Sequence, residues 1–512
     1  MTQSTARGPD ANNRSSEQPW KSYHVAAATV IVLFGITVRL LALLGHRAFW
    51  CDEAMLAMNI TSRGYRGLLG TLDWNQAAPV GYLLAEKFLG NLLGNSEIAL
   101  RLFSFVSGSG CLILGAILSK RYLGPLAGIC AITLLATSET LIYYSNELKQ
   151  YETDAFLFLA FALLMLHAQR TSWNRRAIIA LSAFGAIGLF FSHVFVFAMG
   201  GFFLWIILLE GLNSLFKNWP QWLLVAGAWG LAFILDYHFF LGATDSNRFL
   251  HAHWSTGFLP HPFYSAAAAR WIVRLMFINS AFVIGGDTGR LLAGLLFVCL
   301  ILGAINQWQT SRPLLLLFWC PVVFVFAAAV AGKFPFEGRL ITFLVPGCLI
   351  SAATALDTLR KVPGAPGRWR CAMAFGLIFL PALSAAGRLT APDRREELRS
   401  ILTAIKPRLQ PGDTIYVFTG AWPAFEYYRT ILSTPDLKIV KGADFGDDFS
   451  TYEKNVNRLP HAPRVWLIIS HVLSPTDGDQ GDLYLAPFAR QGRELEHFRA
   501  FGAQSALYDM SE

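Results

Sequence analysis

The sequence changes abruptly from apolar to acidic where VAAATVIVLFGITVRLLALL (Val25–Leu44) is followed by FWCDEAM (Phe49–Met55). The first run is long enough to cross about 30 Å of hydrocarbon as a helix. It is too long for the apolar part of a signal peptide, and no small-residue cleavage site follows it, so we expect a retained transmembrane helix. Asp52 and Glu53 then stand side by side at the predicted membrane surface. They either carry chemistry or mark the point where the chain leaves the lipid.

The composition extends this interpretation to the whole chain. It is 54% hydrophobic and only 15% charged, whereas ordinary globular domains carry about 25% charged residues. The seven cysteines have no spacing typical of a disulfide framework or a zinc site. We predict a polytopic α-helical membrane protein with about eleven transmembrane helices, over residues 23–45, 97–118, 125–142, 155–169, 177–192, 194–212, 222–241, 289–306, 314–331, 339–357 and 371–390.

The positions of the basic residues predict which ends of these spans face the cytoplasm. With the N-terminus in the cytoplasm, every short cytoplasmic loop carries at least one Lys or Arg, and the C-terminus lies outside. The net charge of +8 is then a topology signal, and no motif indicates a nucleic-acid partner. The predicted parts are a disordered cytoplasmic tail (1–22), a transmembrane domain (23–390) and a periplasmic domain (391–512).

Two periplasmic loops interrupt the transmembrane domain. Residues 46–96 contain short amphipathic runs, which favour helices lying in the interface. Residues 242–288 are rich in His, Trp and Phe, and FINSAFVIGG (277–286) within them is either a further short span or an interfacial helix. The pair of histidines in HAHW (251–254) has no third ligand, so we expect an aromatic loop near the acceptor path there rather than a metal site.

The last 120 or so residues have the composition of a soluble α/β domain. TIYVF (414–418) and RVWLIIS (464–470) are β-branched and aromatic runs, which predict strands. AWPAFEYYRTIL (421–432) between them favours a helix, and this alternation predicts a partly parallel sheet. No Gly-rich phosphate loop is present, so no nucleotide site is expected.

With the spans arranged in this way, charged residues from distant parts of the chain meet at the outer face of the membrane. Charge at the membrane is costly and is usually functional. A sugar on a polyprenyl phosphate needs cations for the leaving phosphate and a carboxylate for the proton of the acceptor. The residues in question are Asp52, Glu53, Arg101, Lys149, Glu152, Asp154, Lys333, Glu337 and Arg339.

Five ordered segments resemble motifs of the GT-C superfamily of lipid-phosphate-sugar-dependent glycosyltransferases. The nearest types are the protein O-mannosyltransferases and the lipid A aminoarabinose transferases, the bacterial family 39 and 83 type. The resemblance implies a GT-C fold with a C-terminal extracytoplasmic α/β domain. The segments are FWCDEAM (49–55), NQAAPVGYLL (75–84), EIALRLFSFVSG (97–108), NELKQYETDAF (146–156) and GKFPFEGRLITFLVP (332–346).

The resemblance also implies roles for single residues. Asp52 is the expected catalytic base, Glu53 holds the acceptor or orients Asp52, and Asp154 is a second carboxylate of the cavity. Arg339 is the expected contact of the lipid phosphate. Aminoarabinose transferases tend to have a Lys before the prolines of the first loop, where this chain reads Gln76-Ala77-Ala78-Pro79, so further phosphate contacts fall to Arg101, Lys149 or Lys333. Candidates for binding the acceptor or the sugar are Tyr82, Tyr151 and His193.

These expectations combine into a function. We predict an inverting glycosyltransferase of the bacterial inner membrane that moves a sugar from undecaprenyl phosphate to a lipid, glycan or protein acceptor. Transfer without a metal or other cofactor is expected, because no Asp-x-Asp metal motif is evident. The alternatives are a transporter or flippase of lipid-linked sugars, and a polymerase or ligase of surface polysaccharide. A transporter favours broken or charged helices at mid-membrane and an inverted repeat, and neither is evident in the sequence.

Overall fold

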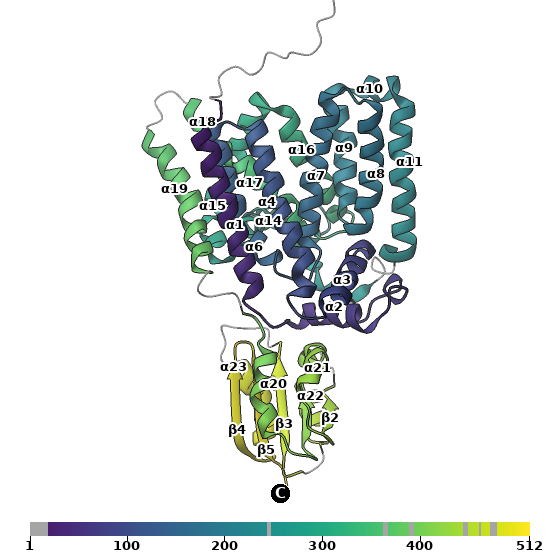
Figure 1. Ribbon diagram of the computed structural model, residues 1–512, viewed down its shortest axis with the longest axis vertical. Coiled ribbons are helices and arrows are strands. Elements are labelled where there is room, and N and C mark those ends of the chain that lie inside the picture. Colours follow the sequence, from purple (N-terminus) through teal and green to yellow (C-terminus); the bar gives the residue numbers. More distant parts are fainter. Residues whose placement is uncertain are drawn as a thin grey trace, which may run out of the picture.

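A bundle of long helices stands above a small α/β domain (Figure 1). This computed structural model describes residues 19–242, 247–361, 367–388, 394–443, 449–459, 462–471 and 479–511. Most of the predicted tail, 1–22, lies outside the described residues.

Eight helices within the described residues are long and apolar enough to cross a membrane, which confirms a multi-pass membrane protein. They are α1 (Ser22–Leu44), α4 (Leu102–Tyr122), α7 (Tyr151–Arg170), α11 (Trp219–Asp236, continued to Leu241), α14 (Ala266–Ile284), α15 (Gly286–Thr310), α16 (Arg312–Val330) and the segment Gly338–Thr358, which holds a 3₁₀ helix (Gly338–Leu344), α17 (Val345–Ala353) and the start of α18 (Ala355–Lys361). The other helices of the bundle are α5 (Pro125–Thr137), α6 (Glu139–Tyr144), α8 (Arg175–Phe191), α9 (Phe195–Glu210), α10 (Leu212–Lys217) and α19 (Gly367–Gly387).

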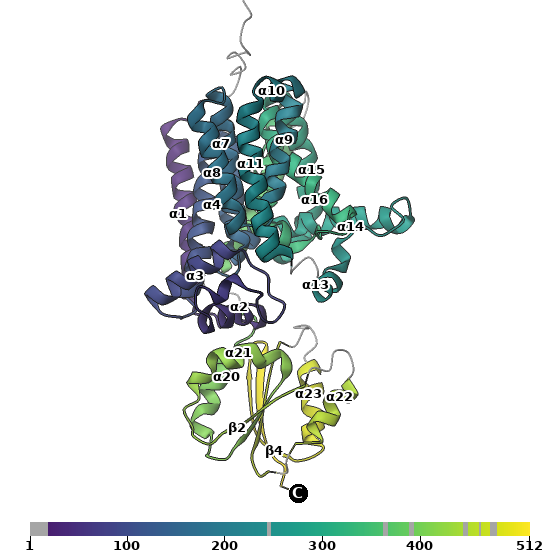
Figure 2. The ribbon, with the colours of Figure 1, turned by 90° about the vertical axis from the view of Figure 1, so that its right-hand side faces the viewer.

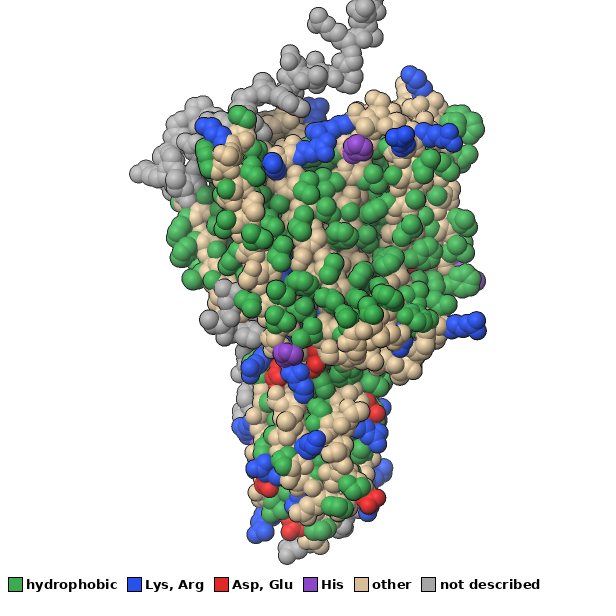
Figure 3. Space-filling view, in the orientation of Figure 1, with side chains coloured by type: hydrophobic (Ala, Val, Ile, Leu, Met, Phe, Trp, Pro, Cys, Tyr) green, Lys and Arg blue, Asp and Glu red, His purple; other side chains and the backbone are tan. Residues whose placement is uncertain are grey.

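The surface of the bundle suits a lipid environment. Figure 3 shows a broad band of hydrophobic side chains across the face of the bundle in view. Lys and Arg side chains gather at the end far from the α/β domain, where α4 ends with Lys120 and Arg121 and α7 ends with Arg170. The opposite end, which we call the domain-facing end, carries α2 (Cys51–Ser62) and α3 (Val80–Leu93) beside the α/β domain (Figure 2).

The segment 242–288 holds more helix than the predicted loop. After α13 (Arg248–His253) the chain forms α14, which reaches sideways out of the bundle, across the direction of its neighbours (Figure 2). Gly285 and Gly286 both have positive φ, at 91° and 58°, and let the chain turn at once into α15. A Cβ at Gly286 would also clash with the carboxylate of Glu139, which together with the positive φ favours glycine there.

The predicted span 125–142 is broken in two at Ser138. The Ser138 side chain accepts a hydrogen bond from the Leu141 backbone N–H and starts α6. The break frees carbonyl groups at the end of α5, and Arg39 of α1 satisfies two of them, Leu135 O at 3.0 Å and Ala136 O at 3.2 Å. A buried cation can therefore be retained in α1, because backbone groups in lipid need a partner within the protein.

The C-terminal domain has the predicted partly parallel sheet, with five strands in the order β2-β1-β3-β5-β4. Strand β1 pairs in parallel with β2 and β3, and β5 pairs antiparallel with β3 and β4. Helices α20 and α21 cover one face, and α22 and α23 cover the other (Figure 2). The elements are α20 (Leu398–Ile405), β1 (Thr414–Val417), α21 (Trp422–Tyr428), β2 (Lys438–Lys441), α22 (Phe449–Val456), β3 (Val465–Ser470), α23 (Asp479–Ala489), β4 (Arg493–Ala500) and β5 (Ala503–Asp509).

Replacing Arg39 by Met should destabilise the protein. Besides Leu135 O and Ala136 O, the guanidinium donates to Gly35 O (3.1 Å) and to Ser145 Oγ (3.1 Å). Methionine fills most of the space but leaves these groups unsatisfied, at a cost of about 2 kcal/mol or more. Thermal unfolding in detergent measures the effect. The matched control is Arg290→Met, which removes a solvent-exposed arginine paired with Asp287; equal unfolding temperatures for the two variants would contradict the assignment.

Candidate active site

Asp52 lies at the start of α2 and is held by two cations from distant segments. Its Oδ1 accepts a hydrogen bond from Lys149 Nζ at 3.0 Å, and its Oδ2 accepts one from Arg339 NH1 at 2.5 Å. Lys149 comes from the turn between α6 and α7, and Arg339 from the 3₁₀ helix Gly338–Leu344. Three segments that the sequence analysis placed at one face of the membrane therefore meet at a single carboxylate.

Gln76 completes this group, and the sequence analysis did not count it as a site residue. Its Nε2 donates to Asp52 Oδ1 at 3.0 Å, and its Oε1 accepts from Lys149 Nζ at 2.6 Å. An amide can serve both partners because it carries a donor and an acceptor. A signal was present, because Gln76 belongs to the stretch before Pro79 of the first loop, the region in which the resembling transferases tend to have a lysine.

The charges around Asp52 keep its carboxylate ionised. Burial by itself would raise the pKa of Asp52, but Lys149 and Arg339, together with the bond from Gln76, hold it well below its ordinary value. The side chain retains 16% of its exposure, so one substrate group can reach it. The site therefore presents a negative oxygen next to two positive groups at the domain-facing end of the bundle.

Glu53, the next residue, is fully buried and serves a different network. Its two oxygens accept from Arg101 Nε and NH2, both at 2.7 Å, and Oε1 also accepts from the Leu148 backbone N–H at 2.8 Å. Arg47 NH2 lies 3.4 Å from Oε2. Burial opposes ionisation, but Arg101 and Arg47 hold the pKa of Glu53 below its ordinary value.

The predicted phosphate contact at Arg101 therefore needs revision. Its guanidinium is buried, binds Glu53 through two nitrogens and donates to Arg47 O at 2.7 Å. The groups are engaged with each other and shielded from solvent, which favours positioning roles for Glu53 and Arg101 over contact with a substrate. The pair ties the first loop to the turn that carries Lys149, so it supports the expected orienting role of Glu53.

Aromatic rings surround Arg339. Its guanidinium carbon lies 5.4 Å from the centroid of Trp254, 5.7 Å from Tyr151 and 6.0 Å from Trp50. Tyr151 was predicted for this site, and Trp254 belongs to the segment predicted as an aromatic loop near the acceptor path. The Nε atom of Arg339 is buried and has no hydrogen-bond partner among the described residues, so the guanidinium keeps a donor for a further ligand.

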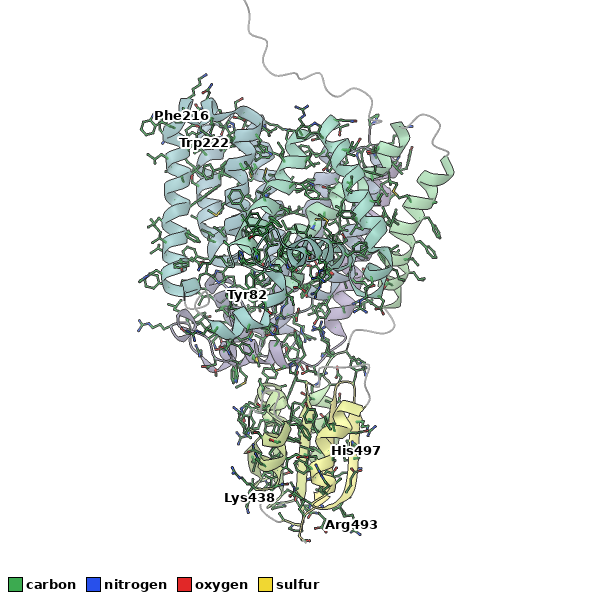
Figure 4. The ribbon with its side chains drawn as sticks, turned by 180° about the vertical axis from the view of Figure 1, so that it is seen from behind. Tyr82, Phe216, Trp222, Lys438, Arg493 and His497 are labelled. Carbon is green, nitrogen blue, oxygen red and sulfur yellow. The ribbon has the colours of Figure 1, made fainter. Side chains whose placement is uncertain are left out.

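Tyr82 and Asp154 lie outside this group. Tyr82 is buried at the domain-facing end (Figure 4), where its hydroxyl is 3.1 Å from Ser104 Oγ, which in turn donates to Lys149 O at 3.0 Å. Tyr82 thus supports the backbone of Lys149 instead of facing a substrate. Asp154 is buried in α7, and its Oδ1 has no hydrogen-bond partner among the described residues. Its predicted role in the cavity remains a prediction.

His193 lines a small pocket next to the Asp52 group. Its Nδ1 lies 3.0 Å from Asp236 Oδ2, which fixes the imidazole ring. The pocket has a volume of about 80 Å³, and Gln76 and Asn247 also line it. Gln76 therefore connects the pocket to Asp52. Lys333, by contrast, is exposed at the turn after α16.

No protein-family model and no curated protein matches the sequence. Among solved structures, ArnT from Cupriavidus metallidurans in the apo state is 16% identical, with a TM-score of 0.55, over 95% of this chain and 99% of that chain. ArnT from the same organism bound to undecaprenyl phosphate is 14% identical, with a TM-score of 0.54, over 95% and 97%. The chain therefore has the GT-C fold that its ordered motifs predicted.

A metal site has no candidate in the part of the chain that the structure describes, where no three His, Cys, Asp or Glu side chains group together. Metal-free transfer stays a prediction.

Replacing Glu53 by Gln should destabilise the fold. The amide can keep one hydrogen bond, but Arg101 is left buried without its counter-charge, which costs about 3–5 kcal/mol. Thermal unfolding in detergent measures the loss. The control is Asp287→Asn, which neutralises a carboxylate in an exposed pair with Arg290. If Glu53→Gln unfolds at the temperature of the control, the pair does not stabilise the protein.

Proposed function

We propose that the protein is an inverting glycosyltransferase that takes a sugar from undecaprenyl phosphate and passes it to a hydroxyl or amine acceptor at the periplasmic face of a bacterial inner membrane. One observation carries the proposal: an ionised Asp52 lies against Lys149 and Arg339 at one end of a GT-C bundle. The ArnT structure solved with undecaprenyl phosphate supports a donor of this class.

Two cations and one unused N–H group are available to bind the phosphate of the sugar donor. Lys149 and Arg339 carry the positive charge, and Arg339 Nε is without a partner among the described residues. Cations placed where charge develops stabilise the transition state for loss of a phosphate group. The rings of Tyr151 and Trp254 beside Arg339 offer apolar faces to the sugar.

The chemistry is a single displacement that inverts the anomeric carbon. The acceptor oxygen or nitrogen forms a bond to that carbon while the bond from the carbon to the phosphate oxygen breaks. The proton of the acceptor passes to Asp52, and the electron pair of the broken bond stays on the phosphate, next to Arg339 and Lys149. The pocket between Gln76 and His193 is the candidate entry of the acceptor.

Binding of the donor also strengthens the base. The pKa of Asp52 is low because Lys149 and Arg339 lie against it. A phosphate that draws off part of their charge leaves burial as the larger effect, and burial raises the pKa of a carboxyl group. Asp52 then accepts a proton more readily when the donor is in place.

The distribution of charge supports the proposed orientation. Lys120, Arg121 and Arg170 lie at the end far from the C-terminal domain, and Lys and Arg are enriched on the cytoplasmic side of membrane proteins. The proposed orientation has the N-terminus in the cytoplasm, and the site and the C-terminal domain in the periplasm.

Replacing Asp52 by Asn should abolish transfer while the protein stays folded. Loss of a general base typically costs about 10²- to 10⁴-fold in rate. Purified protein is given radiolabelled undecaprenyl-phosphate sugars together with membrane acceptors, and release of undecaprenyl phosphate is followed. Asp287→Asn, an exposed carboxylate outside the site, is the control. Movement of the lipid-linked sugar between leaflets without cleavage would replace the transferase by a transporter.

Replacing Lys149 by Gln should move the acid side of the pH–rate profile. A base works only when it is deprotonated, so activity falls as the pH drops through its pKa. Lys149 is the largest cause that lowers the pKa of Asp52, so its removal raises that pKa. The acid limb of the kcat/KM profile should therefore move to higher pH by about one unit or more. Lys149→Arg keeps the charge and should keep the limb in place. An unmoved limb in Lys149→Gln would exclude Asp52 as the titrating base.

A further inference from the structure

We infer that the C-terminal domain is part of the active site, because it holds Phe49, Trp50 and Cys51 and thereby positions Asp52. The four residues that do this are Glu396, Arg395, Tyr428 and His471, and we call them the clamp. The clamp is a set of positioning residues, since none of its contacts within the described part of the chain reaches the Asp52 carboxylate. Its consequence for catalysis rests on the proposed function, whereas its contacts with the first loop do not.

Glu396 caps the helix that carries Asp52. Its Oε2 accepts a hydrogen bond at 2.9 Å from the backbone N–H of Cys51, the first residue of α2. The first N–H groups of a helix have no partner within the helix, and the residue before α2, Trp50, makes no side-chain cap bond. A carboxylate here also suits the positive end of the helix dipole. The cap comes from 345 residues further along the chain.

His471 fixes the orientation of Glu396. Its Nδ1 lies 2.8 Å from Glu396 Oε1, so the two oxygens of this buried carboxylate are divided between α2 and the C-terminal domain. His471 directly follows β3 and has a φ of 62°, which a residue with a side chain rarely adopts. Its ring centroid is 6.2 Å from that of Trp50. The carboxyl end of a parallel strand therefore faces the first loop.

Tyr428 holds Phe49, which lies at the other end of the segment Phe49–Cys51. Its hydroxyl accepts from the Phe49 backbone N–H at 2.8 Å and donates to Glu97 Oε1 at 2.9 Å. Arg399 NH1 also binds Glu97 Oε1, at 2.6 Å. Phe49 is fully buried, and its ring packs against Tyr427 with centroids 5.0 Å apart.

Arg395 connects the clamp to Arg339, the arginine that binds Asp52. Its guanidinium carbon lies 4.6 Å from the ring centroid of Trp50, and that of Arg339 lies 6.0 Å from the same ring. The indole N–H of Trp50 is fixed by a 2.9 Å bond to Glu147 Oε1. One ring therefore contacts an arginine of the C-terminal domain and the arginine that binds Asp52.

A shared apolar core prevents the clamp from separating easily. Ala48, Phe49 and Leu56 of the first loop belong to the same buried cluster as Phe425 and Trp466 of the C-terminal domain. Figure 2 shows α21 directly below α2. Moving the domain away would expose this core to water, so the position of α2 is linked to that of the domain.

The clamp can be tested first without any substrate. Glu396→Ala removes the cap, so the backbone amides at the start of α2 should exchange with deuterium about tenfold faster. Hydrogen exchange of peptides covering residues 46–60 in the full-length protein measures this. Glu453→Ala is the matched control, because Glu453 pairs with Arg490 within the same domain, and it should leave the exchange unchanged. Unchanged exchange in Glu396→Ala would overturn the clamp.

Transfer from radiolabelled undecaprenyl-phosphate sugar then tests positioning. Misplacement of a reacting group by about 1 Å can cost 10²-fold, so kcat of Glu396→Ala should fall about 10- to 100-fold with KM for the donor nearly unchanged. Glu396→Gln keeps an acceptor for Cys51 N–H and a donor for His471, so it should restore most of kcat. Tyr428→Phe, which deletes one hydroxyl, should lower kcat in the same way.

The two proposals fail in different ways. If wild-type protein transfers none of the sugars but exchange accelerates in Glu396→Ala, the clamp stands and the proposed function falls. If wild-type protein is active and Glu396→Ala keeps its kcat, or loses it no more than Glu453→Ala, positioning by the clamp is wrong. A change confined to KM for the donor would also overturn it.

Discussion

The balance of charge at Asp52 is the interaction on which the site depends. A mostly buried carboxylate is costly unless cations offset the loss of water, and here Lys149 and Arg339 do so. Each cation comes from a separate segment, so the charge requirement also fixes the relative positions of α2, the turn before α7 and the 3₁₀ helix Gly338–Leu344. Gln76 adds an uncharged bridge that joins the carboxylate to Lys149.

Two adjacent acids have opposite surroundings because they lie on one helix. Successive residues of an α-helix point about 100° apart, so Asp52 faces the partly open group while Glu53 faces the interior. Glu53 meets Arg101 in a paired, two-bond contact that water does not reach. The first acid is suited to exchanging partners with a substrate. The second is suited to holding the helix still.

The sequence predicted those parts of the site that carry strong physical signals. Asp52, Lys149 and Arg339 are charges at the ends of apolar spans, so threading the spans brought them to one face. Gln76 and Trp254 carry no charge, so the threading could not single them out, and their only signals were the resemblance of the first loop for Gln76 and the aromatic loop 251–254 for Trp254. The crosswise α14 has the length and composition of a span, and only packing decides its direction. Pairing of Glu396 with α2 joins two domains, and no local pattern encodes it.

The proposed reaction explains why α2 needs anchors other than its own ion pairs. A bound phosphate competes with Asp52 for Lys149 and Arg339, so the contacts that fix Asp52 in the free protein weaken when the base must be in place. Glu53 with Arg101 and the clamp around Glu396 do not use Asp52, Lys149 or Arg339: the first is a separate side-chain pair, and Glu396 binds the backbone N–H of Cys51. A base that changes partners during the reaction can keep its position only if other contacts hold its helix. The docking of a separate domain onto Phe49–Cys51 provides such contacts.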